Sequence, residues 1–208
     1  MNFSITKLGI ALAENTKIET LNISNNRIKT QPFTAFFAAI KNNKSLRKIN
    51  ASKTDLSDKV CEKIADFLSM EELRLHEFDL SKNQITDVGF KLIMPAIQKN
   101  RSIEHINFDQ NQLKASGCEA ISACLEENKS IVELSLSGNK INNDGIALLG
   151  QFLKNNETLF YLDISKNPFT DQGFSIFAEH FGESAGLVYL DIQKTKDISD
   201  DQSLIQFA

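Results

Sequence analysis

The chain repeats one short pattern about every 28 residues, and this repetition constrains the fold more than any other feature of the sequence. In the copy at residues 131–141, Leu134 and Leu136 alternate with polar residues, as in a short strand with one buried face. The next residues change to helical spacing, since Ile146 and Leu149 fall on one helical face. Each unit therefore predicts a strand, a tight turn and a helix, which can bury their apolar side only against neighbouring copies.

The other copies carry large apolar residues at the same places and, in most of them, one asparagine. They lie around residues 18–28, 75–85, 103–113 and 159–169, and two degenerate copies lie at 46–56 and 187–195. The recurring asparagines are Asn26, Asn83, Asn111, Asn139 and Asn167. A buried asparagine supplies donors and an acceptor together, so we interpret this row as a structural ladder that satisfies backbone groups in the turns.

A strand–turn–helix unit of this length resembles the leucine-rich repeat, and the full helix after Gly145 resembles the ribonuclease-inhibitor-like subfamily. The resemblance implies an α/β right-handed solenoid, a horseshoe arc with parallel β-strands on its concave face and α-helices on its convex face. It predicts a single domain over 1–208. Within it we expect an N-terminal half-repeat helix over 1–15, six repeats over 16–186 and an incomplete terminal repeat over 187–208.

Two features interrupt the regular pattern. Thr54 replaces the ladder asparagine in one copy, and the chain carries an extra residue near 70–72, where we expect a local distortion. After Thr195 the terminal repeat offers only a short helix with Leu204 and Ile205, and no polar cap. An uncapped repeat exposes apolar surface and a strand edge, so we expect either a longer protein or an end-to-end contact with another subunit or domain.

Glycines recur where the helices are expected to begin, at Gly89, Gly117, Gly145 and Gly173. We expect a close approach of the neighbouring repeat, which a Cβ atom would obstruct. Polar pairs precede three of these glycines, among them Asn143–Asp144. Such residues are expected to cap the first N–H groups of the helix that follows.

Charge and cysteine content bear on partners and compartment. A net charge of −4 disfavours a nucleic-acid partner, which would normally meet a basic surface. No apolar run is long enough for a membrane span, and Met1–Glu14 lacks the features of a signal peptide. Cys61 and Cys118 fall at the position of Ile146, which predicts small core side chains, and the odd cysteine count disfavours a disulfide scaffold.

Four asparagines match the glycan acceptor pattern at one position of the repeat. They are Asn43, Asn100, Asn128 and Asn156. A secreted protein could carry glycans along this row of loops, whereas the alternative is that the repeat consensus creates the matches without such a role. Together with the cysteines, we interpret the row as favouring a reducing, cytoplasmic compartment.

The outward strand positions change in chemistry along the chain, from mixed polar residues through acidic ones to tyrosines beside aspartates. Such a pairing suits protein recognition, because the ring supplies contact area and the acid selects a basic partner group. The alternative is ordinary cross-strand pairing of β-favouring residues. The candidate partner-binding residues are Phe160, Tyr161, Asp163, Tyr189, Asp191, Glu133 and His105.

Motifs of catalysis are absent from the sequence, including a nucleophile elbow, a phosphate loop and an HExxH helix. His76 and His105 lie on adjacent expected strands near Glu77 and Glu104, which could suggest a metal site. They occupy different positions of the repeat, however, and no zinc-type spacing accompanies them. We therefore expect no catalytic residue, no metal and no cofactor.

The sequence thus predicts a non-enzymatic module that binds a protein partner through its concave strand surface. Three alternatives stay open: a regulator of a small GTPase, a segment of a larger receptor or scaffold, and a bacterial effector acting in the host cytosol. Neither a nucleic-acid partner nor a membrane span is expected in any of them.

Overall fold

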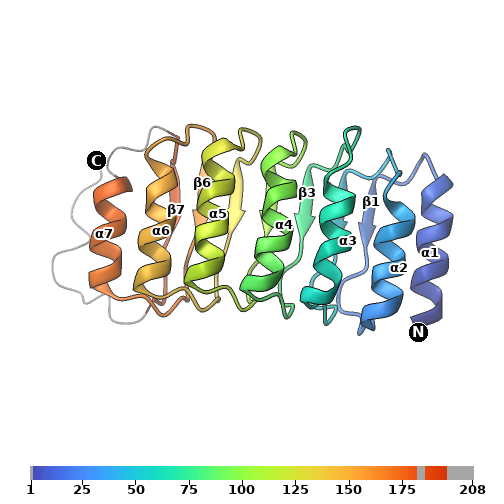
Figure 1. Cartoon of the computed structure of the whole chain (residues 1–208), viewed down its shortest axis with the longest axis horizontal. Helices are drawn as coiled ribbons and strands as arrows, with labels where there is room; N and C mark the ends of the chain where they lie inside the picture. The colour runs from blue at the N-terminus through green and yellow to red at the C-terminus, as the bar shows by residue number, and fades with distance from the viewer. Residues whose placement is uncertain (1, 182–185, 196–208) are drawn as a thin grey trace.

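The computed structural model describes residues 2–181 and 186–195, in which helices and strands alternate along the chain. The strands are β1 (Thr20–Asn22), β2 (Lys48–Asn50), β3 (Glu77–Asp79), β4 (His105–Asn107), β5 (Glu133–Ser135), β6 (Tyr161–Asp163) and β7 (Tyr189–Asp191). The helices are α1 (Asn2–Glu14), α2 (Thr30–Ile40), α3 (Asp58–Leu68), α4 (Asp87–Lys99), α5 (Ala115–Glu127), α6 (Asn143–Leu153) and α7 (Asp171–Phe181). Figure 1 shows the helices side by side in one row, with the strands behind them.

The strands form one parallel sheet in the order of the sequence, and equivalent positions of neighbouring repeats pair with each other. In β1 to β6 the middle residue is buried and the two outer residues are at least partly exposed. The middle residues pair in turn, Ile106 with Leu134 and Leu134 with Leu162. These observations confirm the predicted α/β solenoid with a parallel sheet on one side and helices on the other.

One continuous apolar core lies between the sheet and the helices. Each repeat contributes side chains from its strand, its turn and one face of its helix; Leu134, Ile141 and Leu149 are all at most 2% exposed. The three cysteines lie in this core, and burial raises the pKa of the Cys61 and Cys124 thiols to about 12. They therefore act as small core side chains, as the sequence predicts for Cys61 and Cys118.

A row of asparagines links the turns that follow the strands. Asn139 donates from Nδ2 to the carbonyl of Leu136 in its own turn, at 2.9 Å, and to that of Phe108 in the preceding repeat, at 3.0 Å. Its Oδ1 accepts from the amide of Leu113, also in the preceding repeat. Asn83, Asn111 and Asn167 form the same kind of link. Backbone groups that no strand pairs are satisfied in this way.

A second asparagine row links the helix ends, and it consists of the four residues that match the glycan pattern. Each is buried in the folded chain. Asn128 donates to the carbonyls of Ile97 and Asn100 in the preceding repeat, and its Oδ1 accepts from the amides of Ser130 and Ile131. The hydroxyl of Ser130 donates to the same oxygen. The N-x-S/T pattern is therefore a structural turn between helix and strand.

The helix starts are linked across repeats as well, which corrects one expectation. Asn143 does not cap its own helix: Asn142 does, accepting from the Gly145 amide, whereas Asn143 accepts from the Thr170 amide of the next repeat at 2.8 Å. Asp58 likewise accepts from the amide of Gly89. A Cβ on that glycine would lie 2.5 Å from the Asp58 carboxylate, which is the close approach that the glycine pattern predicts.

Replacing Asn139 by alanine should lower the free energy of unfolding by about 1–3 kcal/mol, because buried backbone groups of two repeats lose their partner. Urea unfolding followed by circular dichroism measures this loss. Asn26→Ala is the matched control, since Asn26 is only half-buried and, among the residues that the structure describes, its side chain donates only to carbonyls of its own turn. The control should lose clearly less. An unchanged unfolding midpoint for Asn139→Ala would contradict the structural role of this row.

Candidate functional site

Parallel pairing brings the predicted partner-binding residues of four adjacent strands together on the face of the sheet that turns away from the helices, here called the concave face. One row of paired residues contains His105, Glu133, Tyr161 and Tyr189. Beside it, Ser135 pairs with Asp163, and Asp163 with Asp191. Six of the seven candidate residues therefore form one continuous surface across β4 to β7, and Phe160 directly precedes β6.

Aromatic and aliphatic side chains gather at the β6–β7 end of this surface. The rings of Tyr161 and Tyr189 stack with centroids 5.0 Å apart and planes 13° apart. The residues before the strands lie side by side, since Val188 donates its amide to the Phe160 carbonyl and Phe160 donates to that of Val132. Tyr189 is 51% exposed, Phe160 47% and Val188 71%. We define the aromatic patch by five residues: Val132, Phe160, Tyr161, Val188 and Tyr189.

Val132 and Val188 are members of the patch that the predicted candidate residues did not include. Both occupy the repeat position of Phe160, so an alignment of the repeats could have identified them. In the earlier repeats this position holds polar residues: Glu19, Arg47, His76 and Glu104. The patch is therefore a local change in a row that is otherwise polar.

Two aspartates lie next to the stacked rings, and their carboxylates also serve the backbone. Asp163 accepts from the amide of Ser165 at 2.8 Å, and Asp191 accepts from that of Gln193 at 2.9 Å. Burial raises the pKa of the Tyr161 hydroxyl, and the negative charges of Asp163 and Asp191 raise it further. The rings and the carboxylates therefore act on each other electrostatically.

Asp109 is a further acidic residue of this surface that the sequence analysis did not single out. It follows β4 at a position where most other copies have serine, and this departure from the repeat could have identified it from the sequence. Its carboxylate accepts from the hydroxyl of Ser135 and from the amide of Ser137. Burial raises the pKa of the Asp109 carboxyl; the two serine hydrogen bonds oppose this rise, and nearby Asp163 and Asp79 add to it.

The concave face is hollowed into a groove of about 780 Å³ that extends from β1 to β6. Toward the N-terminal end, Lys48 pairs with Glu77, and near the middle Nδ1 of His105 lies 2.9 Å from the Glu133 carboxylate. Within the part of the chain that the structure describes, no three His, Cys, Asp or Glu side chains are grouped to hold a metal ion. The groove therefore offers an extended, largely acidic surface.

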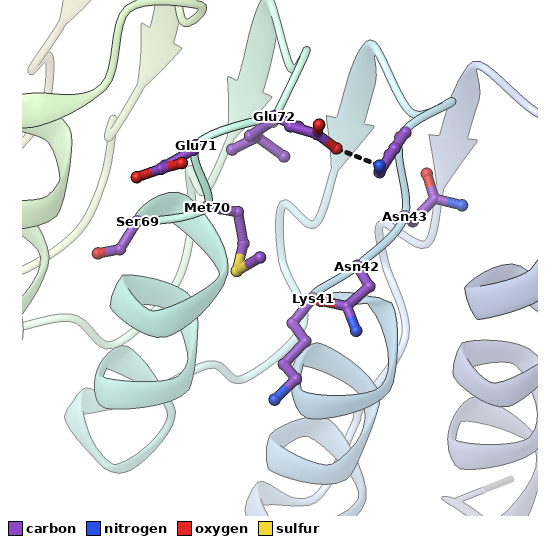
Figure 2. Close-up of a pocket in the computed structure, with 9 residues that line it drawn as sticks. Lys41, Asn42, Asn43, Ser69, Met70, Glu71 and Glu72 are labelled. Carbon is purple, nitrogen blue, oxygen red and sulfur yellow. Dashed lines mark ion pairs between the residues drawn. The ribbon is translucent and has the colours of Figure 1, made fainter.

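A second hollow, of about 550 Å³, lies where the repeat carries its extra residue (Figure 2). Glu72 occupies the position that the asparagines of the helix-end row hold in other repeats, and its side chain reaches outward to pair with Lys44. Met70 lies between the loop of Glu71 and the turn at Lys41–Asn43. The expected distortion is thus a surface notch, formed where one link of the helix-end row is missing.

Family models described as leucine-rich repeat match residues 17–38, 75–94, 99–122, 127–150 and 155–175, which together make up more than half of the chain. The chain is a leucine-rich repeat protein. No helix in residues 2–181 and 186–195 of this leucine-rich repeat protein is both long and apolar enough to cross a membrane.

One curated relative is the RAN GTPase-activating protein 2 of Arabidopsis thaliana, 27% identical over 92 residues. The match covers 44% of this chain but 17% of that protein. Among solved structures, the actin-binding site 2 of leiomodin-1 is 16% identical with a TM-score of 0.50, covering 86% of this chain and 87% of that one. An internalin of Listeria monocytogenes is 17% identical with a TM-score of 0.54, covering 86% and 49% respectively. At such identities the two structures support the fold alone.

Asp109→Asn should reduce the dependence of stability on pH. Because the folded chain raises the pKa of Asp109, stability falls as the pH rises from about 3.8, the ordinary value, through the raised pKa. Asparagine keeps an acceptor for the Ser137 amide and carries no charge. The variant should therefore be at least as stable as the wild type near pH 7, with a flatter profile in urea unfolding across the acidic range. Identical profiles for both proteins would count against this role of Asp109.

Proposed function

We propose that this leucine-rich repeat protein is a non-enzymatic interaction module that binds a protein partner through its concave face. The contact is centred on the aromatic patch together with Asp163 and Asp191. One observation carries this proposal: the rings of Tyr161 and Tyr189 lie stacked beside carboxylates at the end of a groove, and Tyr189 and neighbouring Phe160 are about half exposed. Contiguous exposed apolar surface with a polar rim is typical of protein interfaces.

The rigidity of the sheet supports the same proposal. Tyr161 and Tyr189 project from paired strands, and their mutual stacking restricts both rings before any partner arrives. A tyrosine has few rotatable bonds, so its large contact area is ordered at a small entropic cost on binding. Residues of this kind often contribute most of the binding free energy at interfaces.

The double substitution Tyr161→Ala with Tyr189→Ala tests the proposal by affinity capture from a cell extract with quantitative mass spectrometry. A partner captured by the wild type should lose at least about tenfold in affinity, because two central ring contacts are removed. The matched control is Thr20→Ala with Lys48→Ala, which changes the same repeat position on β1 and β2 at the other end of the groove. A partner that binds the tyrosine variant as tightly as the wild type would show that this is the wrong surface.

A second candidate function is regulation of a small GTPase. The observation that favours it is the 27% identity to a RAN GTPase-activating protein over 92 residues. Rates of GTP hydrolysis by a panel of purified small GTPases, with and without this chain, test the candidate. If the chain stimulates GTP hydrolysis and the tyrosine variant does not, the aromatic patch serves both functions. If no GTPase of the panel is stimulated, this candidate is rejected and the proposed binding module stands.

The other open readings concern context. A segment of a larger receptor or scaffold and a bacterial effector in the host cytosol would each use the same concave face. The three buried thiols are consistent with a reducing, cytoplasmic setting, which we include in the proposal. The predicted end-to-end contact involves the terminal repeat, most of which, including Leu204 and Ile205, lies outside the described residues.

A further inference from the structure

We infer that the partner segment bound at the aromatic patch carries an arginine or lysine flanked by apolar residues, with the cation lying between the tyrosine rings and the carboxylates of Asp163 and Asp191. This inference rests on the proposed function and specifies the chemistry of its partner. Three independent observations support it: the use of aspartate where the turn needs only an amide oxygen, the lack of an ion pair to these aspartates among the described residues, and the arrangement of the rings.

The fold does not require a negative charge at these two positions. Three other repeats have asparagine at the equivalent position, and Asn22, Asn50 and Asn107 accept the same hydrogen bond from the amide two residues further along. The remaining two strands have Asp79 and Ser135 there. Asp163 and Asp191 make that bond with one carboxylate oxygen. An amide oxygen would serve the turn equally well, so the charge of the two aspartates is available for another purpose.

No cation within residues 2–181 and 186–195 forms an ion pair with these aspartates. In the described residues, Glu77 pairs with Lys48 and Glu133 faces His105, whereas no lysine, arginine or histidine forms an ion pair with Asp109, Asp163 or Asp191. The raised pKa values of Asp109 and Tyr161 both include a contribution from the Asp163 charge. Several negative groups thus act on one small region, and a partner cation would lower their mutual repulsion.

The geometry of the rings suits a cation that carries an apolar stem. Tyrosine rings attract a guanidinium or ammonium group to their faces, and arginine can at the same time donate to carboxylates from its planar fork. Tyr161 and Tyr189 stand two residues from Asp163 and Asp191 on the same strands, so rings and carboxylates face the same side. Phe160 and Val188 lie beside them, where the apolar residues that flank the cation in the partner segment would pack.

The test is a selection of short random peptides displayed on phage, carried out on the wild-type chain. Peptides that the variant Tyr161→Ala with Tyr189→Ala no longer binds are then synthesised, each with a copy in which citrulline replaces arginine or glutamine replaces lysine. Binding is measured on the wild type, on Asp163→Asn with Asp191→Asn, and on the control Thr20→Ala with Lys48→Ala. The aspartate variant should melt like the wild type, because asparagine keeps the turn hydrogen bond.

The inference predicts that these peptides are rich in arginine or lysine next to apolar residues. Their affinity should fall about fivefold or more on the aspartate variant and on neutralisation of the peptide cation, stay unchanged on the control, and weaken with added salt. Tyrosine-dependent peptides without basic residues, or with full affinity for the aspartate variant, would overturn the inference and leave the proposed function standing. If all selected peptides bind the tyrosine variant normally, the proposed function fails and the inference with it. Should the aspartate variant not fold, salt-independent binding of the peptides to the wild type overturns the inference on its own.

Discussion

Buried asparagine side chains that bond across the boundary between repeats are the interaction on which this structure depends most. Three-residue strands pair few backbone groups, and the tight turns and helix ends leave many more without a regular partner. Asn139 satisfies such groups on the turn side, and Asn128 does so where a helix ends. Because each side chain serves two repeats, no repeat can complete its hydrogen bonding without its neighbour.

This arrangement divides the chain into positions that the fold uses and positions that it leaves free. The apolar core, the two asparagine rows and the carboxylates at the helix starts all connect one repeat with the next. The outer strand residues contribute less to these connections: they supply the acceptor for a turn amide, as Asp163 does, and exposed ion pairs such as Lys48 with Glu77. Exposed ion pairs stabilise little, so the chemistry of these positions can change along the groove at small cost to the solenoid. The stacked tyrosines occupy these positions together with Asp163 and Asp191, which form no ion pair with any residue that the structure describes. We therefore assign them to the partner.

Much of this fold was predictable from the sequence because the recurring residues align the copies of the repeat with one another. The spacing of apolar residues gave strand, turn and helix, and alternation within each strand placed Tyr161 and Asp163 on the same face. Equivalent positions pair in a parallel sheet, so the neighbourhood of Tyr161 and Tyr189 also followed from the alignment of the copies. The candidate residues were found together for this reason alone.

Other features could not be predicted from the repeat, because a repeat shows which residues recur but not where their side chains point. Asn128 and its equivalents matched a glycan motif, and only the coordinates show that their amides turn inward to cap the preceding repeat. Asn143 was expected to cap its own helix, yet it bonds to the next one. Asp109 and Val132 depart from the consensus at single positions, and their importance depends on neighbours in adjacent strands.

Native-state hydrogen exchange tests the central claim most directly. The amides of Ile85, Leu113 and Ile141 each donate to the side chain of an asparagine in the following repeat. If these links hold the repeats together, the three amides should exchange with opening free energies similar to that of Leu136, whose amide bonds to a backbone carbonyl of the next strand. Exchange of the three amides at the rate of an unstructured peptide, while Leu136 stays protected, would contradict the account.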